Sequence, residues 1–158
     1  MTSGSANASD GPPPFTLRLP IRFTHTDPAG IVFFPRFFEM IQAAVEEWFT
    51  QGLGINFAKF VRDGFGTPTA HTECDFLKPC FLGDFLDIAV TLERVGRTSL
   101  ELSFVGTVDG EERLRARSVL VLFSLIRRAT VPIDGDLRAR LERYRERGMD
   151  GAGDVAKG

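Results

Sequence analysis

A single carboxylate stands in a tight turn just before a long apolar segment, in the run Asp27-Pro28-Ala29-Gly30-Ile31-Val32-Phe33-Phe34-Pro35. Pro28 fixes its own φ, while Gly30 tolerates a positive φ or the close approach of another group. Pro35 suits the first position of a helix, whose unpaired N–H groups and partial positive charge can hold an oxyanion. The pattern therefore indicates acyl-transfer chemistry, although Asp-Pro-x-Gly is also an ordinary turn that caps a helix.

Few other side chains offer comparable chemistry. His25 lies two residues before Asp27 at the end of a strand pattern, so it is a candidate for orienting the site. His71 lies early in a later strand pattern and is a second candidate. Glu39 and Glu46, in the apolar segment after the turn, are rival carboxylates. The sequence contains no close-spaced ligand set that predicts a metal site.

Hydrophobic periodicity predicts the elements that must position these residues. A half-buried strand begins at Phe15, and a helix runs from about Phe34 to Gln51, closed by Gly52. The apolar face of this helix is wide, which indicates that other structure wraps it on most sides. The remaining predicted elements are a short helix at Phe57–Arg62, strands at Thr69–Leu77, Phe85–Val95, Ser99–Val108 and Arg113–Leu125, and a polar helix at Asp134–Arg147.

One buried helix among antiparallel-looking strands predicts an α+β fold, in which a curled antiparallel sheet wraps around one long central helix. Asp109-Gly110 is a hairpin signal between the last two strands, the second of which is apolar on both faces and is expected to be central. A single sheet of this kind leaves an edge and a face uncovered, which favours a homodimer or a dimer of dimers, a homotetramer.

Length and composition are those of one globular domain, expected at residues 15–147, between disordered tails at residues 1–14 and 148–158. The formal net charge of −2 gives no reason to expect nucleic acid as a partner. Cys74 and Cys80 are expected to be free, buried thiols. The start of the chain lacks the features of a signal peptide and no apolar run could span a membrane, so a cytoplasmic protein is the expectation.

The run Thr24-His25-Thr26-Asp27-Pro28-Ala29-Gly30-Ile31-Val32, followed by an aromatic pair, Pro35 and Phe37-Phe38, resembles the signature of the 4-hydroxybenzoyl-CoA thioesterase family of hotdog-fold enzymes. The resemblance continues through Gly66-Thr67-Pro68, Asp75-Phe76 and Gly83-Asp84 to about Arg128. It implies hydrolysis of an acyl-CoA to a free acid and coenzyme A, without a metal or redox cofactor. The alternatives are a hotdog acyl dehydratase and a non-catalytic acyl-CoA-binding module.

The resemblance also implies roles for particular residues. Asp27 would be the nucleophile or the general base on water, and the backbone N–H of Phe34 would polarise the thioester carbonyl. Gly30 belongs to the same catalytic turn, and Thr67 lies in a turn that relatives place near the acyl pocket. Arg97 matches a basic position in relatives and is the first candidate for a phosphate of coenzyme A.

Arg128 is the second candidate for a phosphate contact, and His25 and His71 are candidates for contact with the substrate. The aromatic pair Phe33-Phe34 resembles the branch that acts on aryl-CoA, although that branch tends to carry Tyr or Trp there. We therefore expect an aromatic or other apolar acyl group, with Phe33 as part of its binding surface.

Overall fold

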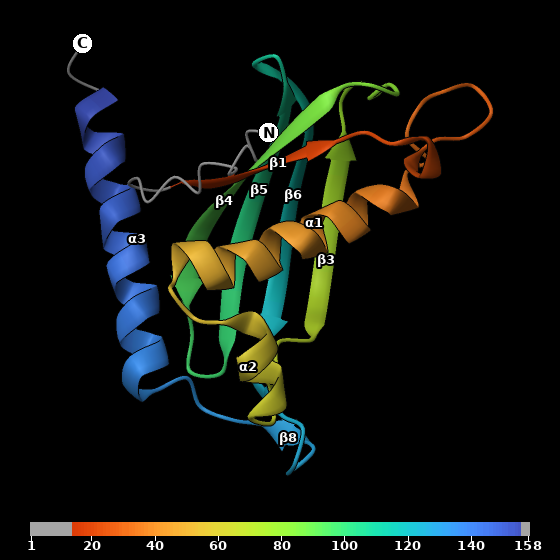
Figure 1. Ribbon diagram of the computed structural model, residues 1–158. Helices are drawn as coiled ribbons and strands as arrows, with labels where there is room; N and C mark the ends of the chain where they lie inside the picture. The colour runs from red at the N-terminus through yellow and green to blue at the C-terminus, as the bar shows by residue number, and fades with distance from the viewer. Residues whose placement is uncertain (1–13, 156–158) are drawn as a thin grey trace, which may run out of the picture.

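The structure is a computed structural model that describes the backbone of residues 14–155. Its main layer is a five-stranded antiparallel sheet with the strand order β1-β4-β5-β6-β3, and α1 crosses one face of it (Figure 1). The elements are β1 (Phe15–Pro20), η1 (Phe23–His25), α1 (Pro35–Glu47), η2 (Trp48–Gly52), α2 (Phe57–Arg62), β2 (Phe65–Gly66), β3 (Thr69–Phe76), β4 (Phe85–Val95), β5 (Ser99–Val108), β6 (Glu111–Val121), β7 (Phe123–Ser124), β8 (Ala129–Thr130) and α3 (Gly135–Val155).

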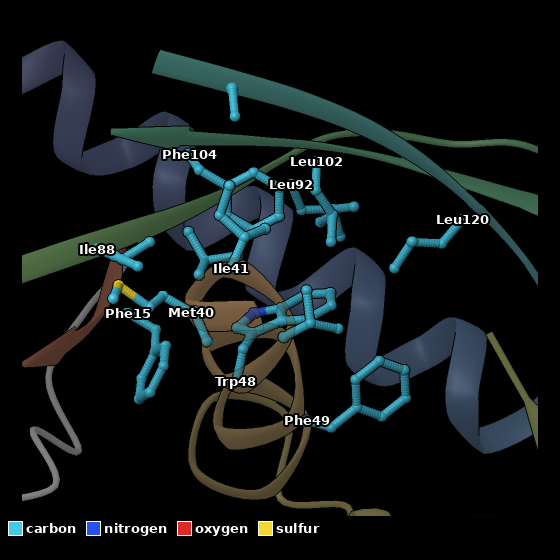
Figure 2. Close-up of a cluster of buried hydrophobic side chains, with 14 of the residues drawn as sticks. Phe15, Met40, Ile41, Trp48, Phe49, Ile88, Leu92, Leu102, Phe104 and Leu120 are labelled. Atoms are coloured by element: carbon cyan, nitrogen blue, oxygen red, sulfur yellow. The ribbon is translucent and has the colours of Figure 1, made fainter. Parts of the chain in front are cut away.

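The apolar face of α1 packs on the inner face of this sheet. Figure 2 shows Met40, Ile41 and Trp48 directed at side chains of β4 and β5. Every second residue of β5 is buried, as expected for a strand with one face on the core. The α+β fold with one long helix across an antiparallel sheet is therefore as predicted.

The end of α1 differs from the prediction of one continuous helix to Gln51. The α-helix ends at Glu47, and a π-helical turn, η2, continues to Gly52. After this turn, the N–H of Leu53 donates to the carbonyl oxygen of Trp48 at 2.9 Å. A Cβ at Gly52 would lie 2.6 Å from Cδ1 of the fully buried Trp48, so the closing glycine is required by packing.

The bounds of β4 and β5 coincide with the predicted strands, and Asp109 and Gly110 both adopt positive φ in the predicted hairpin turn. The last predicted strand, Arg113–Leu125, is instead divided. β6 ends at Val121, and β7 joins β2 and β8 in a small second sheet. The division occurs because the N–H of Leu122 donates to Thr98 and its carbonyl oxygen accepts from Val131.

Helix α3 continues to Val155, although the sequence predicted its end at Arg147 and a disordered tail from Gly148. Glycines at positions 148, 151 and 153 disfavour a helix locally, but a helix already formed extends at little cost. At the other end of the chain, residues 1–13 of the predicted N-terminal tail lie outside the described residues. Within residues 14–155, none of the helices combines the length and the apolarity that crossing a bilayer requires.

The exposed edge of the sheet and the separation of its two ends both matter for the site. β3 is an edge strand, and most of its residues are exposed. The segment with Asp27 contacts the β3–β4 connection, where Val32 donates to Cys80 and Leu82 donates to Gly30. The β4–β5 turn with Arg97 lies at the opposite end of the sheet.

Candidate active site

Asp27 lies at the tip of a tight turn. Its backbone N–H donates to Ile31 at 2.9 Å, and its carbonyl oxygen accepts from Gly30, whose φ is +77°. Carboxylate oxygen Oδ1 accepts the N–H of Ala29 at 2.8 Å. Within the described part of the chain, Oδ2 has no hydrogen-bond donor. One carboxylate oxygen therefore fixes the turn, and the other is available to a ligand.

The turn is anchored to the β3–β4 connection by backbone hydrogen bonds of 2.9 Å from Val32 to Cys80 and 3.0 Å from Leu82 to Gly30. Cys80 is buried, and burial raises the pKa of its thiol to about 11. Both cysteines are free, as predicted, with Cys80 buried and Cys74 half-buried. Burial also raises the pKa of Cys74 to about 11, so neither thiol is a reactive nucleophile near neutral pH.

The start of α1 offers a backbone donor. Phe34 is the N-cap residue and Pro35, which has no N–H, is the first helical residue. The neighbouring N–H groups are engaged, since Phe33 donates to His25 at 3.0 Å and Arg36 donates to Phe33 at 2.9 Å. Among residues 14–155, no acceptor pairs with the N–H of Phe34. This donor sits at the positive end of the helix dipole, where negative charge is stabilised.

Aromatic side chains surround this helix start. Phe33 is 52% exposed, Phe34 57% and Phe76 45%, which is unusual for large apolar side chains. Ring centroids are 5.8 Å apart for Phe33 and Phe34, and 5.9 Å apart for Phe34 and Phe76. Phe37 continues the cluster, with its ring centroid 5.6 Å from that of Phe76. The result is an exposed aromatic surface beside the free N–H.

A groove of about 180 Å³ begins one helical turn further along α1, between this helix and the edge strand β3. Its floor contains a hydroxyl pair, Thr72 and Ser118, whose oxygens are 3.0 Å apart. The lining residues are Phe38, Ile41, Gln42, Val45, Thr69, Thr72, Ser118 and Leu120. The sequence prediction missed this groove, and the one available signal was that Gln42 follows Phe38 by four residues and so shares its helix face.

A backbone hydrogen bond fixes the tautomer of the neutral His25 ring. Its Nδ1 accepts the N–H of Arg22 at 2.9 Å, so any proton of the neutral ring resides on Nε2. Burial, with the positive charges of Arg22 and Arg36, lowers the pKa of His25. Its carbonyl oxygen accepts from Phe33, directly before the free donor of Phe34. The structure thus brings His25 together with the Asp27 turn.

The structure does not place His71 beside Asp27 within one chain. His71 lies 3.7 Å from Glu73, whereas Thr72, which alternates with them, faces the groove under α1. The rival carboxylates are engaged elsewhere, because Glu39 pairs with Arg36 at 2.8 Å and Glu46 accepts from Gln42 at 3.3 Å.

Thr67, Arg97 and Arg128 gather at the other end of the sheet. Thr67 follows β2, which pairs with β7, and Arg128 directly precedes β8. The carbonyl oxygen of Arg97 accepts the N–H of Ile133 at 2.7 Å. β4, which separates the two ends, spans about 33 Å at ~3.3 Å per residue. One chain therefore does not bring its own Arg97 or Arg128 to its own Asp27.

These elements define a hotdog fold, and comparisons with known proteins agree. The model of the thioesterase-like superfamily matches residues 21–141. A 1,4-dihydroxy-2-naphthoyl-CoA hydrolase from Acaryochloris marina is 29% identical over 128 residues, which cover 78% of this chain and 93% of that protein. The chain belongs to the thioesterase-like superfamily. It is a thioesterase, as the sequence predicted.

Solved structures show the same fold. A 1,4-dihydroxy-2-naphthoyl-CoA thioesterase from Synechocystis has a TM-score of 0.72 at 22% identity, and the match covers 80% of this chain and 94% of that one. A thioesterase from Thermus thermophilus, complexed with coenzyme A and Zn, has a TM-score of 0.72 at 26% identity, and the match covers 84% and 95%. The predicted resemblance to hotdog thioesterases is therefore confirmed.

Proposed function

We propose that this protein hydrolyses an aryl-CoA thioester to the free aryl acid and coenzyme A, with Asp27 and the backbone N–H of Phe34 as the reacting groups. The observation that carries the proposal is the N–H of Phe34, which has no acceptor among residues 14–155 and lies in an exposed aromatic surface close to the Asp27 turn. The relatives' activity on 1,4-dihydroxy-2-naphthoyl-CoA supports the choice of coenzyme A and of an aromatic acyl group.

In this reaction the thioester oxygen accepts the N–H of Phe34, which withdraws charge from the carbonyl carbon. If Oδ2 of Asp27 attacks that carbon, the C–S bond breaks, the thiolate of coenzyme A leaves, and water then hydrolyses the mixed anhydride to the free acid and restores the carboxylate. If Oδ2 instead takes a proton from an attacking water, the water oxygen bonds to the carbon and the same C–S bond breaks. The hydrogen bond from Ala29 to Oδ1 holds the carboxylate in place. Gly30 permits the turn, since its φ of +77° strains any residue with a Cβ.

The acyl ring lies against Phe33, Phe34 and Phe76, where offset aromatic contacts are favourable. From there the groove between α1 and β3 receives the far side of the ring. Gln42, Thr69 and the Thr72–Ser118 pair supply hydrogen-bonding groups among the apolar side chains that line the rest of the groove. This combination suits an aryl group that carries a polar substituent such as a hydroxyl.

The active form is at least a dimer, in which the edge strands β3 of two copies pair antiparallel. The exposed edge of β3 and the exposed aromatic surface beside it support this arrangement. A twofold axis at β3 reverses the second sheet, so its Arg97 end faces the Asp27 end of the first. Each site then combines Asp27 and Phe34 of one copy with Thr67, Arg97 and Arg128 of the other.

The proposal is tested by replacing Asp27 with Asn, which is nearly isosteric and removes the negative charge and one acceptor oxygen. Thiol release from a panel of aryl-CoA and alkyl-CoA thioesters is measured for wild type, Asp27→Asn and the control Glu39→Gln. We expect aryl-CoA to be preferred by wild type and turnover to fall at least ~100-fold in Asp27→Asn alone. Normal turnover in Asp27→Asn, or loss in Glu39→Gln, would reject the assignment.

A further inference from the structure

We infer that Arg138 is a positioning residue that fixes the β4–β5 turn so that Arg97 faces the phosphates of coenzyme A, an inference that rests on the proposed function. Arg138 lies in the first turns of α3, and its side chain extends to this turn and to the segment before α3. Its guanidinium donates from Nη2 to the carbonyl oxygen of Gly96 at 2.6 Å and from Nε to that of Ile133 at 2.7 Å.

These hydrogen bonds close a ring around Arg97. Gly96 and Ile133 both accept from Arg138, and the N–H of Ile133 donates to the carbonyl oxygen of Arg97 at 2.7 Å. The N–H of Gly96 donates to Ser99 at 2.8 Å, which completes the turn. One guanidinium therefore binds the residue before Arg97 and also binds Ile133, whose N–H donates to Arg97 itself.

Backbone hydrogen bonds also hold this turn, since Leu122 donates to the carbonyl oxygen of Thr98 at 2.8 Å. Among the described residues, Arg138 supplies the side-chain hydrogen bond to it. Gly96 has no side chain, and the Arg97 side chain is exposed, with no ion-pair partner among the described residues. The side chain of Arg138, in contrast, is partly covered and has an ion-pair partner, since its Nη1 lies 3.4 Å from Oε1 of Glu142. The charge of Arg138 is thus engaged, and the charge of Arg97 is left for an anionic ligand.

A planar guanidinium is required for this role. Its Nε and Nη2 donate in fixed directions to two carbonyl oxygens at once, which the single ammonium of lysine cannot reproduce. Arg140, two residues along the same helix, provides a matched control. It pairs with Asp136 at 2.7 Å and donates to the carbonyl oxygen of Leu53 at 2.9 Å, so it ties a different loop to α3.

The test compares Arg138→Met, Arg138→Lys, Arg140→Met and Arg97→Ala. Steady-state kinetics use 4-hydroxybenzoyl-CoA and the 4-hydroxybenzoyl thioester of N-acetylcysteamine, which lacks the nucleotide. We expect both Arg138 variants to raise KM for the CoA thioester roughly threefold to tenfold, with kcat and the truncated substrate unaffected. Amide hydrogen exchange of Gly96 and Ile133, whose N–H groups are hydrogen-bonded at this turn, should accelerate in both. Arg140→Met should leave KM and this exchange unchanged.

The double variant Arg97→Ala, Arg138→Met should be no worse in KM than Arg97→Ala alone, because the two residues act through one contact. Additive losses, equal losses on both substrates, or a normal KM in Arg138→Lys would overturn the positioning role. A failure of the proposed phosphate contact can be told from a failure of the Arg138 role by comparing KM of the two single variants. A normal KM in Arg97→Ala would remove the phosphate contact itself, whereas a raised KM in Arg97→Ala beside a normal KM in Arg138→Met would overturn only the role of Arg138.

Discussion

Asp27 and Phe34 present one free acceptor and one free donor from a single short segment. The turn is closed by its own backbone, and its hydrogen bonds with Cys80 and Leu82 fix it on the sheet. Such groups need no rearrangement when charge develops on a thioester oxygen, which is the condition for effective electrostatic stabilisation. Losing one oxyanion donor typically costs ~3–4 kcal/mol of barrier, so in the proposed mechanism the helix start would contribute on the scale of a catalytic side chain.

Protonation of His25 makes the free energy of unfolding depend on pH. Folding lowers its pKa from the ordinary value of 6.5 through burial and through Arg22 and Arg36, against the opposing effect of Glu39. The unfolded chain therefore binds the proton more readily. This share of stability is present above pH 6.5 and decreases as the pH falls from 6.5 toward the folded-state pKa.

We predict that His25→Asn loses less stability than wild type between about pH 7.5 and pH 5.5, the range around the ordinary pKa of histidine. The Asn Oδ1 can still accept the N–H of Arg22, but it does not titrate. Urea denaturation at several pH values measures the difference. Parallel pH profiles for the two proteins would show that protonation of His25 is not opposed by the fold.

The sequence allowed the Asp27 turn and the helix start to be predicted because both depend on local residues, above all Gly30 and Pro35. It did not allow Phe76 or the Thr72–Ser118 pair to be assigned to the site. Their position depends on the register of β3 with β6, which is set by packing of the whole sheet. The local geometry was thus predictable, and the walls of the candidate site were not.

Among the elements, β4 and β5 were predictable to the residue because alternation of buried and exposed side chains is a strong signal. The end of α1 was not predictable, because its π-helical turn depends on the contact between Gly52 and Trp48. The role of α3 was also missed. Its sequence is polar, yet it covers the part of β4 that extends past β1.

Tyr144 of α3 contacts β1 and β4 at this place. Its buried hydroxyl accepts the N–H of Phe15 at 2.8 Å and donates to the carbonyl oxygen of Val90 at 2.6 Å, at the end of the β1–β4 ladder. Tyr144→Phe leaves both backbone groups unpaired, which should lower the free energy of unfolding by about 1–3 kcal/mol. Chemical denaturation checks this, with the exposed Arg143→Ala on the same helix as the control. Equal stability of wild type and Tyr144→Phe would mean that water replaces the hydroxyl.

As a whole, the molecule keeps Asp27 and the start of α1 at one end of the sheet and the β4–β5 turn with Arg97 at the other. A thioester of coenzyme A needs both, since its carbonyl carbon must reach Asp27 and its phosphates need cations. Antiparallel pairing of two copies at the exposed edge strand β3 would bring the Asp27 end of one sheet to the Arg97 end of the other. The proposed dimer would thus meet both requirements. This separation could not be predicted from composition or periodicity, since neither fixes the order of strands.

The composite site predicts complementation between two variants, one defective in turnover and the other in binding of coenzyme A. Asp27→Asn lacks the carboxylate, and the double variant Arg97→Ala, Arg128→Ala lacks the cations. In a mixed dimer, one site combines an intact Asp27 from the double variant with intact arginines from the other subunit, and the second site carries both defects. Random mixing after unfolding and refolding makes half of the dimers mixed, so activity should recover to about a quarter of the wild-type value. Thiol release at a substrate concentration below the wild-type KM measures the recovery, and each variant refolded alone is the control. If each chain held a complete site of its own, the mixture would be no more active than the two variants assayed separately.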